Sequence, residues 1–484
     1  MTGETVRPAE TVRDWTVWAL ALLAALAVAV PLLRPAPAAL IQQDSAGYLA
    51  FDAARTAGYP LLLRLVEHLP GGLATLPALQ LAAYGAAALC LALAFRRLAG
   101  SRIAAGLLLL VLLGNPQVTR LSFMVMTEAP FLACLALVLA LVCRLLLRPR
   151  WQVLALVSLV AGIAVLIRPA GYALVMLLPL VAFWSWRDGL PAIRSALAAA
   201  LPYLVVLGCG MVAYHAAHGS WRTQNFLAKS NLFGKAAAIA DPALPVKDRA
   251  LVALIAAAVA PDRAMIDRAP GLFGRYLMLT AYYDAWHFRM LPGPIAAQAG
   301  IAPGDPAALD AKLLDLAVEI IAADPLAYLG DAAQSYAALW WMPDALTHAE
   351  LARFDAFLAA AGPLPDIGRY PDWHQPHSDL LILGLRGFML AALASSLWWA
   401  WRFAESLVRR RRQPPLDRLG AACALAVHAS FVLTALLQAG IPRYVWALWP
   451  ALAVLVVAGA TALAPTLRRR SLTPPFPSRP RPGW

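Results

Sequence analysis

Charged residues are scarce in this chain. Only 14% of its 484 residues are Asp, Glu, Lys or Arg, whereas 61% are hydrophobic. A soluble domain is typically less than half apolar and about a quarter charged, so this composition excludes an ordinary soluble protein. The long apolar runs predict helical spans, and the expected fold is an all-α polytopic membrane protein.

Cysteine is rare, and the long polar segment between residues 216 and 378 contains none. The five cysteines all fall inside apolar runs: Cys90, Cys134, Cys143, Cys209 and Cys423. A disulfide framework for the polar segment is therefore excluded, and the spacing offers no thiolate metal site. Packed, unreactive thiols are the simplest interpretation.

Apolar runs that could cross a bilayer recur along the chain. A spanning helix needs about 20 mostly apolar residues. About ten spans are predicted, at residues 15–33, 76–95, 103–115, 121–147, 151–167, 170–186, 195–215, 379–401, 417–438 and 442–464. The first lacks a small-residue cleavage site and is interpreted as an anchor, not a removable signal. The third is short enough to be tilted or partly re-entrant.

The net charge of +13 comes from basic residues that lie in short clusters between apolar runs. This pattern is typical of cytoplasmic loops, so it gives no indication of nucleic-acid binding. It predicts cytoplasmic N- and C-termini, and it places the long segment 216–378 outside. The abundance of Arg and Ala is typical of a GC-rich bacterial genome, so we expect a multi-pass protein of the bacterial inner membrane.

Four regions follow from this topology. We predict an N-terminal membrane module at 1–215, with an amphipathic outer loop at 34–75, and a mostly helical extracytoplasmic domain at 216–378 between spans seven and eight. A C-terminal membrane module at 379–465 and a Pro-rich, disordered cytoplasmic tail at 466–484 complete the chain.

Within the outer segment, residues 310–328 carry apolar side chains at near-helical spacing, and Pro325 should end or kink that helix. The aromatic residues of the outer segment include Tyr282, Trp286 and the pair Trp340-Trp341. They fit either contact with the membrane interface or a core of the domain itself.

Four ionisable residues occur where long apolar runs begin or end: Asp44, Glu128, Arg168 and Arg443. A charge at such a depth is costly and is usually retained for a site or a partner. The topology places all four on the non-cytoplasmic face. Their convergence there would suit chemistry on a substrate anchored in the bilayer.

The first outer loop contains Asp44, Tyr48, Arg55 and the run Gly58-Tyr59-Pro60. Asp44 could be the N-cap of an amphipathic helix running to about Gly58. It could also be a general base that deprotonates an acceptor hydroxyl. The residues alone leave both interpretations open.

An Asp soon after the first span, followed by Tyr48 and then Gly58-Tyr59-Pro60, resembles the GT-C superfamily of membrane glycosyltransferases. The aminoarabinose transferase and protein O-mannosyltransferase branches are the most similar. Four further segments carry the resemblance: Thr127-Glu128-Ala129-Pro130-Phe131, Ile167-Arg168-Pro169, Asp324-Pro325-Leu326-Ala327-Tyr328 and Arg443-Tyr444.

The resemblance implies transfer of a sugar from a polyprenyl-phosphate donor to a hydroxyl group on a lipid, glycan or protein acceptor. Asp44 would be the base, and Arg168 and Arg443 would receive the leaving phosphate, because a guanidinium offers a planar fork of donors. Snorkelling to the membrane surface is the alternative role for both arginines. The remaining residues of these motifs would bind substrate: Tyr48, Arg55, Tyr59, Glu128 and Tyr444.

Glu128 begins a very apolar helix, where the helix dipole alone would favour an acid. It could also bind a metal, the acceptor or an arginine. No Asp-x-Asp or Glu-x-x-His motif lies near Asp44, so no cofactor is predicted, although a divalent cation stays open. Asp372, His374, His377 and Asp379 cluster just before the eighth span and are interpreted as a solvated loop.

Two other functions fit parts of the pattern. An O-antigen polymerase or ligase would also carry a large outer loop, and would depend on loop residues such as His374. A lipid-linked sugar transporter or flippase would place charges near the bilayer midplane in matching halves, and no internal repeat is found.

Overall fold

The computed structural model describes residues 39–42, 44–224, 228–285, 292–302, 305–341, 346–361, 378–437 and 442–471, and the isolated positions Ala19 and Leu22. Within these residues every regular element is a helix, and the only extended pairing is a parallel bridge between Leu40 and Met124. The predicted helical membrane fold is confirmed in outline. The first predicted span, 15–33, lies outside the described residues apart from Ala19 and Leu22.

Six helical segments are long and apolar enough to cross a membrane. They are Gly72–Ala99 (η2 Gly72–Thr75 with α4 Leu76–Ala99), α7 Glu128–Leu147, Pro169–Arg187 (η3 Pro169–Gly171, α9 Tyr172–Val175 and α10 Leu177–Arg187), α11 Ala192–His218, α19 Asp379–Val408 and α20 Pro415–Leu437. Three further apolar helices are shorter: α5 Arg102–Leu113, α8 Trp151–Ile167 and the first part of α22 Trp449–Ser471.

Two predicted spans are interrupted. The span at 170–186 divides at Met176 into α9 and α10, and the span at 442–464 divides at Leu448 into α21 Pro442–Ala447 and α22. Pro179 and Pro450 have no backbone N–H to donate to the carbonyl four residues earlier, so continuous helix hydrogen bonding fails just before each proline. α22 also continues to Ser471, beyond the predicted boundary at residue 465; residues 472–484 lie outside the described part.

The predicted span at 121–147 begins later than expected. α6 Pro116–Leu121 ends before it, the chain then extends, and α7 starts only at Glu128. The extended stretch is held by the first outer loop, because Leu40 N donates to Phe123 O at 2.7 Å and Val125 N donates to Leu40 O at 3.0 Å. Glu128 is therefore the first residue of α7, which agrees with the motif at residues 127–131 and not with the predicted start at residue 121.

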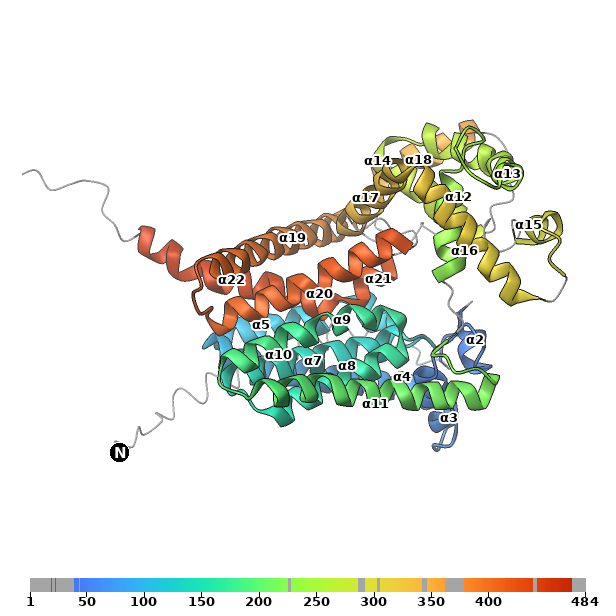
Figure 1. Ribbon diagram of the computed structural model, residues 1–484. Coiled ribbons are helices and arrows are strands. Elements are labelled where there is room, and N and C mark those ends of the chain that lie inside the picture. Colours follow the sequence, from blue (N-terminus) through green and yellow to red (C-terminus); the bar gives the residue numbers. More distant parts are fainter. Residues whose placement is uncertain are drawn as a thin grey trace, which may run out of the picture.

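The bundle is built around α7 and α20. In each of these helices 67% of the apolar window is buried, compared with 22% in α11 and 28% in α19. α7 packs against α4 and α8, and α20 packs against α19 and α22. Consecutive helices run in alternating directions, so the bundle has two distinct ends (Figure 1). The apolar outer faces of α11 and α19 fit contact with lipid.

The predicted domain at 216–378 is helical in its described parts and lies at one end of the bundle (Figure 1). Its helices are α12 Ala228–Ala238, α13 Arg249–Arg268, α14 Gly271–Ala285, α15 Pro292–Gln298, α16 Pro306–Ala323, α17 Pro325–Trp341 and α18 His348–Ala361. As predicted, the chain breaks at Asp324, and Pro325 starts the next helix. The domain has its own core, which includes Phe233, Ile255 and Leu316.

Helix α17 joins this domain to the bundle. Tyr328 Oη donates to Leu436 O of α20, and Tyr336 Oη lies 2.6 Å from His428 Nδ1 of the same helix. His428 Nε2 in turn lies 3.0 Å from Ser396 Oγ of α19. Trp340 packs into the bundle core, while Tyr282 is buried in the domain core. These two aromatics are therefore core residues; Trp286 lies outside the described residues.

Candidate functional site

Two short helices of the first outer loop lie at the same end of the bundle as α12–α18: α2 Ser45–Leu49 and α3 Gly58–Glu67 (Figure 1). Ser45 Oγ fixes the start of α2, because it donates to Val125 O at 2.9 Å, three residues before Glu128. The loop and the start of α7 are thereby held together.

The predicted single helix from Asp44 to Gly58 is wrong. α2 ends at Leu49, and the chain turns at Phe51, which has a φ of +48°. The buried Phe51 ring packs edge-on against Tyr214 and His218 of α11, and Tyr214 Oη donates to Ala53 O at 2.7 Å. These long-range contacts stabilise a turn that local helical spacing does not indicate.

Helix α3 approaches the end of α8 closely. A Cβ atom on Gly58 would lie 2.6 Å from Leu166 O, a separation too short for any side chain. Thr56 Oγ1 donates to Ile167 O at 3.3 Å beside it. The glycine of the Gly58-Tyr59-Pro60 motif therefore lets the outer loop sit directly against the residue that precedes Arg168.

Asp44 occupies the N-cap position of α2, yet its side chain makes no capping hydrogen bond. Asp44 Oδ1 instead accepts a hydrogen bond from Arg55 Nη2 at 2.9 Å, with side chains 28% and 20% exposed. The Arg55 guanidinium lies 4.4 Å from the centre of the Tyr48 ring, and Nη1 donates to Tyr48 Oη at 3.3 Å. The N-cap interpretation is therefore wrong, and these three residues form one unit.

Tyr59 extends this unit inward. Its ring meets Tyr48 edge-on, with centroids 5.3 Å apart, and its hydroxyl donates to Gln80 Oε1 at 3.3 Å. Gln80 Nε2 donates to Ser122 O at 2.9 Å and to Met124 O at 3.1 Å. Burial raises the pKa of Tyr59, and the nearby charge of Glu128 raises it further, so the phenol stays protonated.

Glu128 is paired with Arg168. Arg168 Nη1 lies 2.6 Å from Glu128 Oε1 and donates to Thr127 Oγ1 at 3.3 Å. Arg168 is only 6% exposed, which excludes snorkelling to the surface, and its guanidinium lies 5.1 Å from the centre of the Tyr444 ring in α21. The sequence left a metal, the acceptor or an arginine as possible partners of Glu128, and the structure pairs it with an arginine.

Seven of the eight predicted site residues therefore lie in two sets of contacts, linked by the electrostatic effect of Glu128 on Tyr59, and we call the two sets together the outer-loop network. Its members are Asp44, Tyr48, Arg55, Tyr59, Glu128, Arg168 and Tyr444. The side chain of Arg443 lies outside the described part of the structure, as do Asp372, His374 and His377.

Sequence reasoning missed Gln80, Ser45 and Tyr214. Gln80 had a signal, because it is a lone amide in the apolar run Leu76-Pro77-Ala78-Leu79-Gln80-Leu81. Ser45 and Tyr214 had none, since their partners are backbone carbonyls of distant segments.

The carboxylates of the network do not suit a divalent cation. Asp44 and Glu128 each face a guanidinium. Across the residues that the structure describes, no group of three His, Cys, Asp or Glu side chains could hold a metal ion. Divalent cations are usually bound by several oxygen ligands, and this set offers paired charges in their place.

The comparison with known proteins adds no relative: no protein-family model, no curated protein and no solved structure matches this chain.

Proposed function

We propose that this chain is an integral-membrane glycosyltransferase that moves a sugar from a polyprenyl-phosphate donor to an acceptor hydroxyl. One observation carries the proposal: the loop that carries the carboxylate of Asp44 is bound to the segment just before Glu128, which pairs with the buried guanidinium of Arg168. Helices α2 and α3, which carry part of the network, lie at the same end of the bundle as α12–α18 (Figure 1).

Asp44 is the proposed base. Its side chain is 28% exposed, so an acceptor hydroxyl can reach it from the aqueous side, and its ion pair with Arg55 holds the carboxylate in place. The acceptor oxygen would form a bond to the anomeric carbon while its proton passes to Asp44. The bond from the anomeric carbon to the phosphate oxygen breaks, and its electron pair leaves with the polyprenyl phosphate.

Arg168 is the proposed partner of the leaving phosphate. Arg443, which directly precedes Tyr444 in the sequence, is the second proposed arginine. A guanidinium carries five N–H donors, and Glu128 and Thr127 are both contacted by the same nitrogen, Nη1. Glu128 and Thr127 would therefore position the guanidinium. Its other nitrogen atoms would bind phosphate oxygens, a geometry that arginine provides well.

The surface of α3 fits a lipid-linked substrate. Tyr59, Leu63 and Val66 face inward, while Leu61 and Leu65 are exposed on the same short helix. An amphipathic helix with exposed leucines is typical of the membrane interface. The proposed donor would keep its prenyl chain in the bilayer and present its phosphate to the outer-loop network. In this proposal the network faces the extracytoplasmic side of a bacterial inner membrane, and both termini are cytoplasmic.

The test is Asp44→Asn in the full-length protein. Lipid mass spectrometry of a deletion strain and its parent identifies the polyprenyl-phosphate sugar that accumulates, and transfer from that donor is then measured in vitro. Loss of a general base predicts a rate lower by about 10²- to 10⁴-fold.

Asp52→Asn is the matched control, because Asp52 lies in the same loop, is exposed and only accepts a hydrogen bond from Ala54 N at 3.2 Å. Its rate should stay close to that of the wild type. Full activity of Asp44→Asn, or equal loss in both variants, would remove Asp44 as the base.

A further inference from the structure

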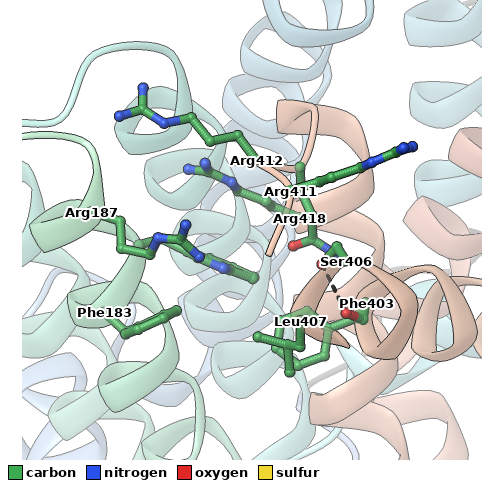
Figure 2. Close-up of a pocket in the computed structure, with 10 residues that line it drawn as sticks. Phe183, Arg187, Phe403, Ser406, Leu407, Arg411, Arg412 and Arg418 are labelled. Atoms are coloured by element: carbon green, nitrogen blue, oxygen red, sulfur yellow. Dashed lines mark hydrogen bonds between the residues drawn. The ribbon is translucent and has the colours of Figure 1, made fainter. Parts of the chain in front are cut away.

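A second candidate site lies at the opposite end of the bundle, where α10 ends, α19 ends and α20 begins. A small hollow, open to solvent, lies there. Its floor is apolar: Trp184 and Phe403 meet edge-on with centroids 6.2 Å apart. Figure 2 shows Phe183, Phe403 and Leu407 on the lower side of the view and the arginines above them.

The hollow carries an excess of positive charge. Four arginines line it: Arg187, Arg411, Arg412 and Arg418. Arg418 is paired with Asp188 through both terminal nitrogens. Within the described residues, no carboxylate pairs with the other three. An unbalanced cluster of three guanidiniums around a concave surface favours an anionic ligand.

Two buried donors in the lining have no acceptor. Arg418 is 7% exposed, and its Nε has no hydrogen-bond partner among the described residues. Gln413 Nε2 likewise has no hydrogen-bond partner within the described part of the chain. A buried N–H without an acceptor is destabilising, because it has lost its hydrogen bond to water. Both residues line the hollow, so a ligand with several acceptor oxygens would satisfy them.

The surroundings distinguish a lipid from a soluble anion. On the helices whose ends line the hollow, Leu407, Trp186 and Trp401 are exposed, and Val408 is 84% exposed. Exposed tryptophans beside arginines are typical of the membrane–water interface. A ligand here would have its charged group among guanidiniums and its apolar part against these side chains. We propose that the hollow binds the phosphate headgroup of an anionic phospholipid, a site independent of the proposed sugar transfer.

The test uses the purified full-length protein in detergent and short-chain phosphatidylglycerol as the probe, with binding followed by native mass spectrometry. The variant Arg411→Gln/Arg412→Gln removes two exposed guanidiniums from the lining. Each basic residue near an anionic headgroup contributes about 1 kcal/mol, so binding should weaken about 30-fold.

Arg409→Gln/Arg410→Gln is the matched control, because it removes the same charge from adjacent residues that do not line the hollow. It should change affinity by less than about threefold, as expected for charges outside the site. Arg187→Gln, in α10, provides an independent variant and should weaken binding about fivefold.

Two further ligands complete the experiment. Short-chain phosphatidylcholine should bind at least ~10-fold more weakly than phosphatidylglycerol, because its headgroup has no net charge to match the arginines. Inorganic phosphate should not displace phosphatidylglycerol at equal concentration. Equal weakening by both double variants, or full displacement by inorganic phosphate, would overturn the proposed phospholipid site.

Discussion

Two buried arginine–carboxylate pairs lie at opposite ends of the same bundle, and they differ in what surrounds them. Arg168 is 6% exposed and pairs with Glu128, whose side chain is 1% exposed. Arg418 is 7% exposed and pairs with Asp188, whose side chain is 20% exposed. The first pair is enclosed by protein. The second opens onto a hollow that three more arginines line.

The difference shows that a buried arginine–carboxylate pair can belong to two kinds of site. At the outer end each described charge of the network has an opposite partner, so buried positive charge is neutralised before any ligand binds. At the other end four arginines line the hollow, and among the described residues only one of them, Arg418, is paired with a carboxylate, that of Asp188. The first arrangement suits the positioning of a reacting group, and the second suits retention of an anion.

The largest expected effect is from Glu128→Gln. Loss of the carboxylate leaves Arg168 buried without its counter-charge, and such a change costs about 3–5 kcal/mol. A lower thermal unfolding temperature of the protein in detergent would measure it. Replacing both residues, as in Glu128→Leu/Arg168→Met, should recover most of the stability but no transfer activity. Wild-type stability of the single variant would contradict the enclosed pair.

A smaller effect is expected from Asp188→Asn. Water reaches this pair, so its loss should cost about 1–2 kcal/mol, less than that of Glu128→Gln. The positive charge of Arg418 then has no counter-charge, so phosphatidylglycerol should bind about fivefold more tightly in the mass-spectrometric assay. Destabilisation as large as that of Glu128→Gln would break the comparison between the two ends.

The smallest effect is expected from Glu405→Gln. Glu405 pairs with Arg409 at 3.2 Å one helical turn away, and both side chains are substantially exposed. Exposed pairs of this spacing contribute about 0.3–0.5 kcal/mol, so the unfolding temperature should stay within the measurement error of the wild type. A clear decrease would show that position along the bundle, and not burial, decides the strength of these pairs.

Helix boundaries could be predicted from the sequence where the residues that flank a helix determine its ends. The predicted span 151–167 coincides with α8, since Arg150 precedes it and Pro169 follows it closely. The breaks before Pro179 and Pro450 were missed because the surrounding residues are uniformly apolar, although each proline was a usable signal. The turn at Phe51 could not be predicted, because Tyr214 and His218 stabilise it from another helix.

The sequence identified most residues of the outer-loop network, but it did not identify which of them pair with one another. Charge at span ends identified Asp44, Glu128 and Arg168, because an apolar background makes such residues conspicuous. Which guanidinium faces which carboxylate depends on how helices pack: Arg55 reaches Asp44 across the turn at Phe51, and Arg168 reaches Glu128 from the end of α8. No pattern in a single sequence specifies those distances.

The attachment of α17 to α20 has a mechanical consequence. Tyr328 and Tyr336 are two helical turns apart on α17, and both contact α20. Two points of attachment remove the freedom to swivel about either one. Helix α17 therefore cannot pivot about a single contact, and any displacement of α17 must strain both of its contacts with the central helix α20.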